Sequence, residues 1–276
     1  MKVVPASRGW QWLSLGWRLF KRSPLAWIGL VLGYWLLIAL INEIPMLGAA
    51  ISTLLLPAFS VSFMEACAAA ESGTRPSLRM VFDGFRKRFS TLLVVGGLYL
   101  ISILMVLGIA SLVDGGTLFR WIVRGISPPE SAISNGSVLG ALLLASGIAT
   151  PAFMAFWFAP VLAAWRDMGA AQSMFYSFFA SLQNWRAFAI YAIVIAIAGL
   201  VFSLAITVLA VAARGNPAIM RGLMLGLTIG LLPTIFASFF YSYQDIFGMD
   251  EDQNSGTPGG DRVDTPPIPP EPESNT

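Results

Sequence analysis

The chain has 276 residues, of which 56% are hydrophobic and only 12% carry a charge, whereas about a quarter of the residues in soluble domains are charged. Histidine is absent, and Cys67 is the single cysteine. This composition excludes a disulfide within the chain, a Cys/His metal site and every mechanism that needs an imidazole base. We therefore expect a membrane protein that holds no metal and no cofactor.

Six long stretches contain no charged residue. They have 20, 21, 25, 35, 27 and 23 residues. They begin after the charged residues Arg22, Glu43, Arg88, Glu130, Arg186 and Arg221. A helix needs roughly 20 apolar residues to cross a hydrocarbon core about 30 Å thick. The sequence therefore predicts an all-α, polytopic membrane protein with six transmembrane helices.

The predicted organisation has three parts. Residues 1–24 form an amphipathic interfacial segment, residues 25–247 form the transmembrane domain, and residues 248–276 form an acidic, Pro-rich tail. The six predicted spans cover about 25–41, 46–68, 90–113, 140–165, 188–213 and 219–245. Short connections between successive spans predict three helical hairpins.

The chain begins with a stretch of amphipathic character. Trp10, Leu13, Trp17 and Phe20 recur at helical spacing, while basic and polar side chains occupy the other faces. Such a helix is suited to the headgroup layer of a bilayer, although packing on a partner's soluble domain is an alternative. Residues 71–89 and 166–187 have similar patterns. We therefore expect an interfacial segment before each odd-numbered span.

The basic residues are distributed unequally between the two sides of the predicted membrane. With the N-terminus inside, that side receives 13 basic residues and the other side receives 4. The positive-inside rule then places both termini and all three interfacial segments in the cytoplasm. The tail has seven acidic residues and one basic residue, a net charge of −6. Its composition is typical of disorder, so we interpret it as a solubilising tail, with a ligand for a proline-recognising partner as the alternative.

Three prolines lie inside the even-numbered predicted spans. Pro57, Pro151 and Pro233 are 94 and 82 residues apart. An interfacial segment, a span and a span with proline would thus recur three times in one orientation, which makes a parallel repeat. A proline kinks a helix, and three kinked helices could surround a shared cavity. The alternative is that these prolines are tolerated because neighbouring groups satisfy the freed carbonyls.

Two further sets of residues are candidate sites. Basic residues beside the spans attract anionic headgroups, although topology signalling explains them equally well. These candidate lipid-headgroup contacts are Arg18, Lys21, Arg22, Arg86, Lys87 and Arg88. Glu65 is a candidate intramembrane polar site, with a salt bridge or a helix cap at the cytoplasmic end as the simpler interpretation.

Common classes of membrane enzyme lack their residues here. Without histidine, the chain cannot form a serine–histidine intramembrane protease or an HExxH metalloprotease. It also contains no acidic cluster for diphosphates and no P-loop. We therefore assign no catalytic residue and expect no enzymatic activity.

The opening sequence VPASRGWQWLSLGWRLFKRSPLAW, the PAF prolines and the six-span layout carry a resemblance to a known family. Residues 4–245 resemble a family of uncharacterised proteobacterial six-span inner-membrane proteins, a domain of unknown function. The resemblance implies a location in a bacterial inner membrane. It implies no catalytic residues.

The leading hypothesis for function is a non-enzymatic envelope protein that acts through contacts with lipids or proteins. The expected partners are membrane lipids, anionic ones in particular, and other membrane proteins, whereas nucleic acid is not expected because the basic residues are tied to the bilayer surface. The alternative is a transporter or channel for a small or amphipathic solute, and a third interpretation is an enzyme acting on lipid. The sequence does not indicate an oligomeric state.

Overall fold

The computed structural model describes residues 1–212 and 216–248. All regular secondary structure in these residues is helical. The first half contains α1 (Arg8–Arg22), α2 (Pro24–Asn42), α3 (Gly48–Glu71), the 3₁₀ helix η1 (Leu78–Arg86), α4 (Phe89–Asp114) and α5 (Thr117–Arg124). The second half contains α6 (Glu130–Ser134), α7 (Ser137–Trp157), α8 (Ala159–Trp165), α9 (Ala170–Gln183), α10 (Trp185–Ala212) and α11 (Pro217–Phe247). The predicted all-α class is confirmed.

Five stretches within the described residues are long and apolar enough to cross a membrane. They are Pro24–Asn42, Gly48–Glu71, Phe89–Asp114, Ser137–Trp165 and Trp185–Leu209. These stretches coincide with the first five predicted spans. The sixth predicted span, 219–245, falls on α11, which is 31 residues long. Many side chains in the first half of α11 lie outside the description, so the sixth crossing stays a prediction.

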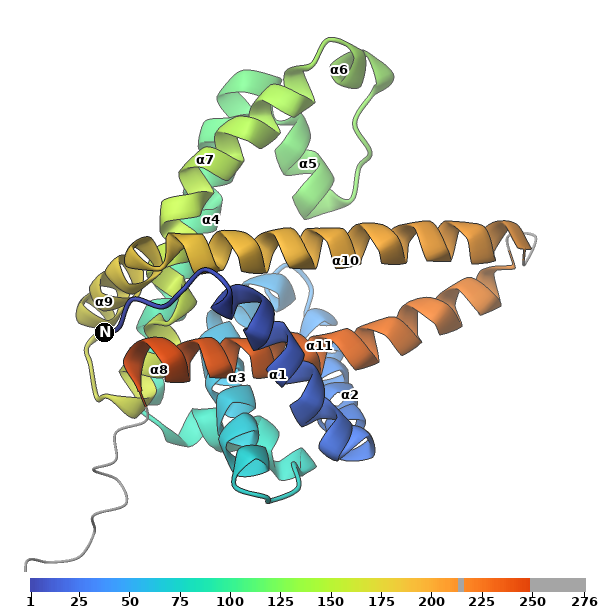
Figure 1. The fold of residues 1–276 in the computed structure, drawn as a ribbon. Coiled ribbons are helices and arrows are strands. Elements are labelled where there is room, and N and C mark those ends of the chain that lie inside the picture. Colours follow the sequence, from blue (N-terminus) through green and yellow to red (C-terminus); the bar gives the residue numbers. More distant parts are fainter. Residues whose placement is uncertain (213–215, 249–276) are drawn as a thin grey trace, which may run out of the picture.

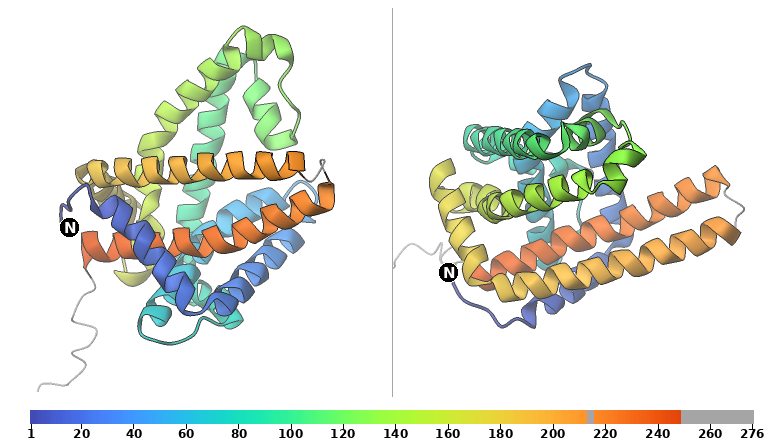
Figure 2. Two further views of the ribbon diagram at one scale, coloured as in Figure 1. Left: turned by 45° about the vertical axis from the view of Figure 1, so that its right-hand side comes forward. Right: turned by 90° about the horizontal axis from the view of Figure 1, so that it is seen from above.

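The long helices diverge from one end of the molecule. Helices α4 and α7 run together toward α5 and α6, whereas α10 and α11 extend as a long pair in another direction (Figures 1 and 2). Only 6% of the span in α10 is buried inside the protein, against 50% of the span in α3. The exposed apolar length of α10 is suited to contact with lipid rather than with water.

The main core lies at the end from which the long helices diverge, where α1, η1, α8 and α9 pack on them; we call this end the base. Its fully buried side chains include six large aromatic residues. They are Trp12, Trp27, Phe59, Phe63, Phe158 and Phe240. The rings of Phe63 in α3 and Phe236 in α11 stack at 4.1 Å, and such pairs contribute about 0.5–1.5 kcal/mol beyond the area they bury.

The three short segments at the base each pack on a helix that contains a proline. Helix η1 packs on α3, which contains Pro57, and Gly84 makes this contact. Its amide donates to the Ser62 hydroxyl at 2.9 Å, and that hydroxyl donates to the carbonyl of Ala58. A Cβ on Gly84 would collide with the Ala58 carbonyl oxygen. Glycine is therefore required here by the close approach of two backbones.

Helix α1 repeats this arrangement on α11, which contains Pro233. A Cβ on Gly16 would collide with the carbonyl oxygen of Thr234 and lie 2.8 Å from the amide nitrogen of Ser238. Thr234 and Ser238 follow Pro233 by one and five positions, as Ala58 and Ser62 follow Pro57. The equivalent contact joins the first helix of the chain to the last.

Helix α9 packs on α7, which contains Pro151, through serines instead of glycine. The Ser177 hydroxyl donates to the carbonyl of Met154 at 2.8 Å and accepts the amide of Phe158 at 2.8 Å. It thus occupies the place of the backbone hydrogen bond from Phe158 to Met154. An inserted side chain of this kind interrupts a helix, which explains why α7 ends at Trp157 and α8 begins at Ala159.

These contacts give the predicted interfacial segments a second role. In α1, Trp12 and Leu19 are fully buried, whereas Trp10 and Trp17 are 57% and 45% exposed. In α9, the face with Ser173, Ser177 and Ser181 is buried. The segments therefore pack on the bundle with one face and present aromatic side chains outward with the other. The predicted tail, 248–276, lies outside the described residues except for Gly248.

Candidate functional site

An apolar pocket of about 290 Å³ lies where the three proline-containing helices meet. Its lining residues come from α3, α4, α7, α10 and α11, with Pro160 from α8. They are Leu56, Pro57, Ser60, Val95, Tyr99, Phe153, Phe156, Trp157, Pro160, Tyr191, Ile235, Phe236 and Phe239. None of these described lining residues is charged. The pocket therefore presents hydrocarbon and aromatic surface to an occupant.

The pocket has a buried floor and an exposed mouth. Val95, Phe156 and Phe239 are at most 9% exposed and form part of the floor. Phe153 and Ile235 are 53% and 36% exposed and lie at the mouth. Both mouth residues belong to long helices, and α7, which carries Phe153, is apolar enough to cross a membrane. If these helices span the bilayer, the mouth faces its hydrocarbon.

The three predicted kink prolines occupy different environments. Pro57, Pro151 and Pro233 all lie inside helices. Pro57 lines the pocket, Pro151 is exposed, and Pro233 is buried without lining the pocket. The residues that follow the prolines contribute more of the wall, from Phe153 to Trp157 in α7 and from Ile235 to Phe239 in α11. A cavity therefore lies between these helices, but only one of the three prolines lines it and its surface is mainly aromatic.

Glu65 does not face the pocket. Its carboxylate accepts the Trp165 indole N–H at 2.6 Å and pairs with the Lys87 ammonium at 2.8 Å. These contacts join α3, α8 and the residue that follows η1. The geometry corresponds to the salt bridge that was the simpler interpretation of Glu65.

A second carboxylate of α3 has similar contacts. Glu71 accepts the hydroxyl of Tyr241 at 2.6 Å and pairs with the Arg22 guanidinium at 3.1 Å. It thus joins α3 to α11 and to the end of α1. Both contacts reach the same carboxylate oxygen, Oε2, so one oxygen of Glu71 accepts a neutral and a charge-assisted hydrogen bond together.

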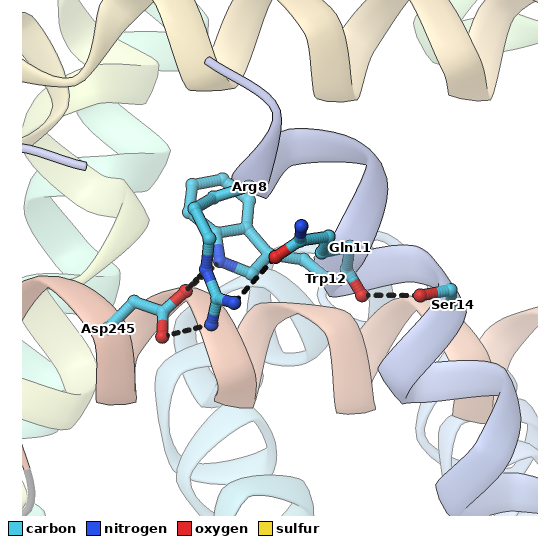
Figure 3. Close-up of polar contacts among 5 residues, drawn as sticks. All are labelled: Arg8, Gln11, Trp12, Ser14 and Asp245. Carbon is cyan, nitrogen blue, oxygen red and sulfur yellow. Dashed lines mark hydrogen bonds and ion pairs between the residues drawn. The ribbon is translucent and has the colours of Figure 1, made fainter. Parts of the chain in front are cut away.

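Asp245 of α11 is the third such carboxylate. It forms an ion pair with Arg8 and accepts the Trp12 indole N–H at 2.6 Å (Figure 3). Arg8 also donates to the amide oxygen of Gln11 at 2.6 Å. Sequence reasoning did not connect these residues, because no local pattern links positions so far apart.

The candidate headgroup contacts fall into two groups. Arg22, Lys87 and Arg88 pair with Glu71, Glu65 and Asp167. Arg18, Lys21 and Arg86 are exposed and form no ion pair among the described residues. Lys21 lies 5.9 Å from the centre of the Trp17 ring. The charges of Arg18, Lys21 and Arg86 are therefore available to an anion outside the protein. The paired group serves mainly to join helices.

The most informative functional residues are aromatic ones that sequence reasoning did not select. Phe156, Trp157 and Phe239 line the pocket five or six positions after their prolines. The signal for them was present in the parallel strings PAFMAFW and PTIFASF. Recognising these positions required attention to the residues after each proline rather than to the proline itself.

The all-helical fold and its five long apolar helices define the class of the protein, which is a polytopic helical membrane protein. A probable inner membrane protein of Burkholderia thailandensis is 35% identical to the chain over 258 residues, and the match covers 90% of this chain and 94% of the relative. The chain belongs to the same family and is an integral inner-membrane protein, which confirms the resemblance inferred from the sequence. No family model matches the chain, and no solved structure matches it.

Proposed function

We propose that this inner-membrane protein is a non-enzymatic lipid-binding protein that holds an acyl chain of a membrane lipid in its central pocket. The pocket itself carries this proposal. Its described lining residues carry no charge, its mouth opens among exposed apolar side chains, and its walls come from all three proline helices. Ligand pockets are mostly apolar with few polar groups, and this pocket of about 290 Å³ is close to the smallest of them, which measure roughly 300 Å³.

The chemistry of the lining favours a hydrocarbon chain over a polar solute. Ser60, Tyr99 and Tyr191 are the hydroxyl-bearing residues among those that line the pocket. The Tyr191 hydroxyl already shares a hydrogen bond of 2.7 Å with Ser238. Trp157 also lines the pocket, and its buried indole N–H has no hydrogen-bond partner among the described residues. An ion or a polar solute would lose its hydration in such a site and would gain few partners. A transporter for polar solutes therefore receives no support from the pocket.

The lipid headgroup has a separate set of contacts in this proposal. Arg18, Lys21 and Arg86 carry exposed positive charges at the base of the molecule. A basic side chain near the membrane surface attracts an anionic headgroup by about 1 kcal/mol. We propose phosphatidylglycerol as the class of lipid, because its headgroup is anionic and its chains are apolar. The 13 to 4 distribution of basic residues supports a cytoplasmic position for the base and for both termini.

Photolabelling of the full chain in nanodiscs tests the proposal. The probe is phosphatidylglycerol with a diazirine in the middle of one acyl chain, and labelled residues are located by mass spectrometry. We expect adducts on the floor residues Val95, Phe156 and Phe239. Ile235→Trp should obstruct the mouth and lower labelling of the floor several-fold.

Leu231→Trp provides the matched control. Leu231 is 38% exposed, lies one turn before Ile235 on α11 and does not line the pocket. This variant should label as the unmodified protein does. Adducts confined to outward surfaces such as α10, or equal loss of floor labelling in the two variants, would overturn the proposal.

A further inference from the structure

A second apolar pocket adjoins the central one. This outer pocket has a volume of about 350 Å³ and lies between α4, α5 and α7. Its walls include Ile103, Leu118 and Leu142, and none of the described residues that line it is charged. The Ser102 and Thr150 hydroxyls donate to carbonyls of their own helices at 2.8 Å. Because these hydroxyls already have acceptors, a hydrocarbon chain can fill the outer pocket and both hydroxyls keep their hydrogen bonds.

Tyr99 and Phe153 belong to the walls of both pockets. Tyr99 lies on α4 and packs edge-on against Phe156 at a ring separation of 5.2 Å. Phe153 lies on α7 and is 53% exposed. The two pockets therefore lie side by side along the contact between α4 and α7, with these two rings in the walls of both.

We propose that one acyl chain of a bound phospholipid occupies both pockets, passing Tyr99 and Phe153 from the central pocket to the outer one. This inference rests on the proposed function and adds the path and direction of the chain. The central pocket lies nearer the base, where Arg18, Lys21 and Arg86 would hold the headgroup. The outer pocket lies toward α5, so it receives the methyl end.

Two phosphatidylglycerol probes distinguish the ends of the chain in the full-length protein in nanodiscs. One carries a diazirine near the carboxyl end of a long acyl chain, and the other carries it near the methyl end. The first should label Phe156 and Phe239. The second should label Ile103 and Leu118.

A variant that narrows the outer pocket gives a second measurement. Ala149 lines the outer pocket and not the central one. Ala149→Phe should therefore lower labelling of Ile103 and Leu118 by the methyl-end probe several-fold. Labelling of Phe156 by the carboxyl-end probe should remain. Leu143→Phe, at a position of α7 that is 66% exposed and lines neither pocket, should change neither signal.

The outcomes separate this inference from the proposed function. If both probes labelled both pockets to the same extent, separate acyl chains would occupy the two pockets. That result would overturn the continuous path. Labelling of the central pocket alone, by either probe, would also overturn it while leaving the proposed function intact. Failure of both probes to label the central pocket would overturn both proposals.

Discussion

Arg8 and Asp245 lie 237 positions apart in the chain and form an ion pair that joins the first helix to the last (Figure 3). The Arg8 Nε donates to Asp245 Oδ2 at 2.6 Å, and a second guanidinium nitrogen donates to Oδ1. The two side chains are 31% and 19% exposed. A partly buried, two-point contact of this kind specifies geometry more strongly than a surface ion pair does.

The Arg8 contact predicts that Asp245→Asn destabilises the protein. The substitution removes the charge that balances the Arg8 guanidinium and weakens the hydrogen bond from Trp12. We expect a loss of about 1–3 kcal/mol in the free energy of unfolding, measured by unfolding of the purified protein in detergent micelles. Asp167→Asn is the control, because Asp167 is 86% exposed in its pair with Arg88 and should cost roughly 0–1 kcal/mol. Equal losses would contradict the prediction.

The close approach of η1 to α3 predicts an effect of a single methyl group. Gly84→Ala should destabilise the protein by about 1–3 kcal/mol, because the backbone of α3 must move to admit the Cβ. Gly108→Ala on α4 is the control, since no atom lies within 4 Å of a Cβ there. It should leave stability unchanged or raise it by up to about 1 kcal/mol through helix propensity. Thermal unfolding of both variants checks the difference, and a stable Gly84→Ala protein would disprove the proposed constraint.

The inserted hydroxyl between α7 and α8 predicts a cost for Ser177→Ala. The variant leaves the Phe158 amide without its buried partner and leaves the Met154 carbonyl with only the longer contact of 3.4 Å from the Ser181 hydroxyl. This loss should cost about 1–3 kcal/mol. Ser203→Ala on the exposed part of α10 should have no measurable effect. Denaturant unfolding in micelles compares the two variants. An equally stable Ser177→Ala protein would show that water or backbone rearrangement replaces the hydroxyl.

The two groups of basic residues predict different consequences of charge removal. Combined replacement of Arg18, Lys21 and Arg86 by glutamine should lower the ratio of phosphatidylglycerol to phosphatidylethanolamine that remains bound after purification, while stability stays the same. Lys87→Gln should instead lower stability, because it removes the ionic partner of Glu65 and leaves that carboxylate with the Trp165 indole alone. Native mass spectrometry measures the lipid ratio. An unchanged ratio in the triple variant would contradict the headgroup assignment.

The proposed orientation predicts the behaviour of reporter fusions. Green fluorescent protein fused after Gly248 should fluoresce, and alkaline phosphatase at the same point should be inactive, because both termini are placed in the cytoplasm. Alkaline phosphatase inserted after Ser134, in the connection between the third and fourth predicted spans, should be active. The reverse pattern would overturn the orientation.

Much of the secondary structure could be predicted because it depends on local properties of the chain. The stretch between Arg22 and Glu43 lacks charges and is long enough to cross a bilayer, and α2 occupies it. The same reasoning located α3, α4 and α10 to within a few residues. It did not predict the break at Phe158, because that break depends on the hydroxyl of Ser177, which comes from another helix.

The candidate site was only partly accessible to sequence reasoning. The recurrence of Pro57, Pro151 and Pro233 was compatible with a shared cavity between the even-numbered helices and with prolines that are merely tolerated, and it did not reveal which residues would line a cavity. Pro151 is exposed, whereas Phe156, one and a half turns later, lies in the floor of the pocket. Which face of a helix points inward depends on its rotation against its neighbours.

The sequence alone indicated that this chain enters a membrane, located its first five apolar spans to within a few residues, and showed that it lacks the residues of common membrane enzymes. Hydrocarbon solvates only long apolar helices, so composition and length suffice for these conclusions. The tertiary structure decided that Arg22, Lys87 and Arg88 join helices, that α1 packs on α11, and that the pocket is aromatic. Those features arise from contacts between residues far apart in the chain, and local patterns do not encode such contacts.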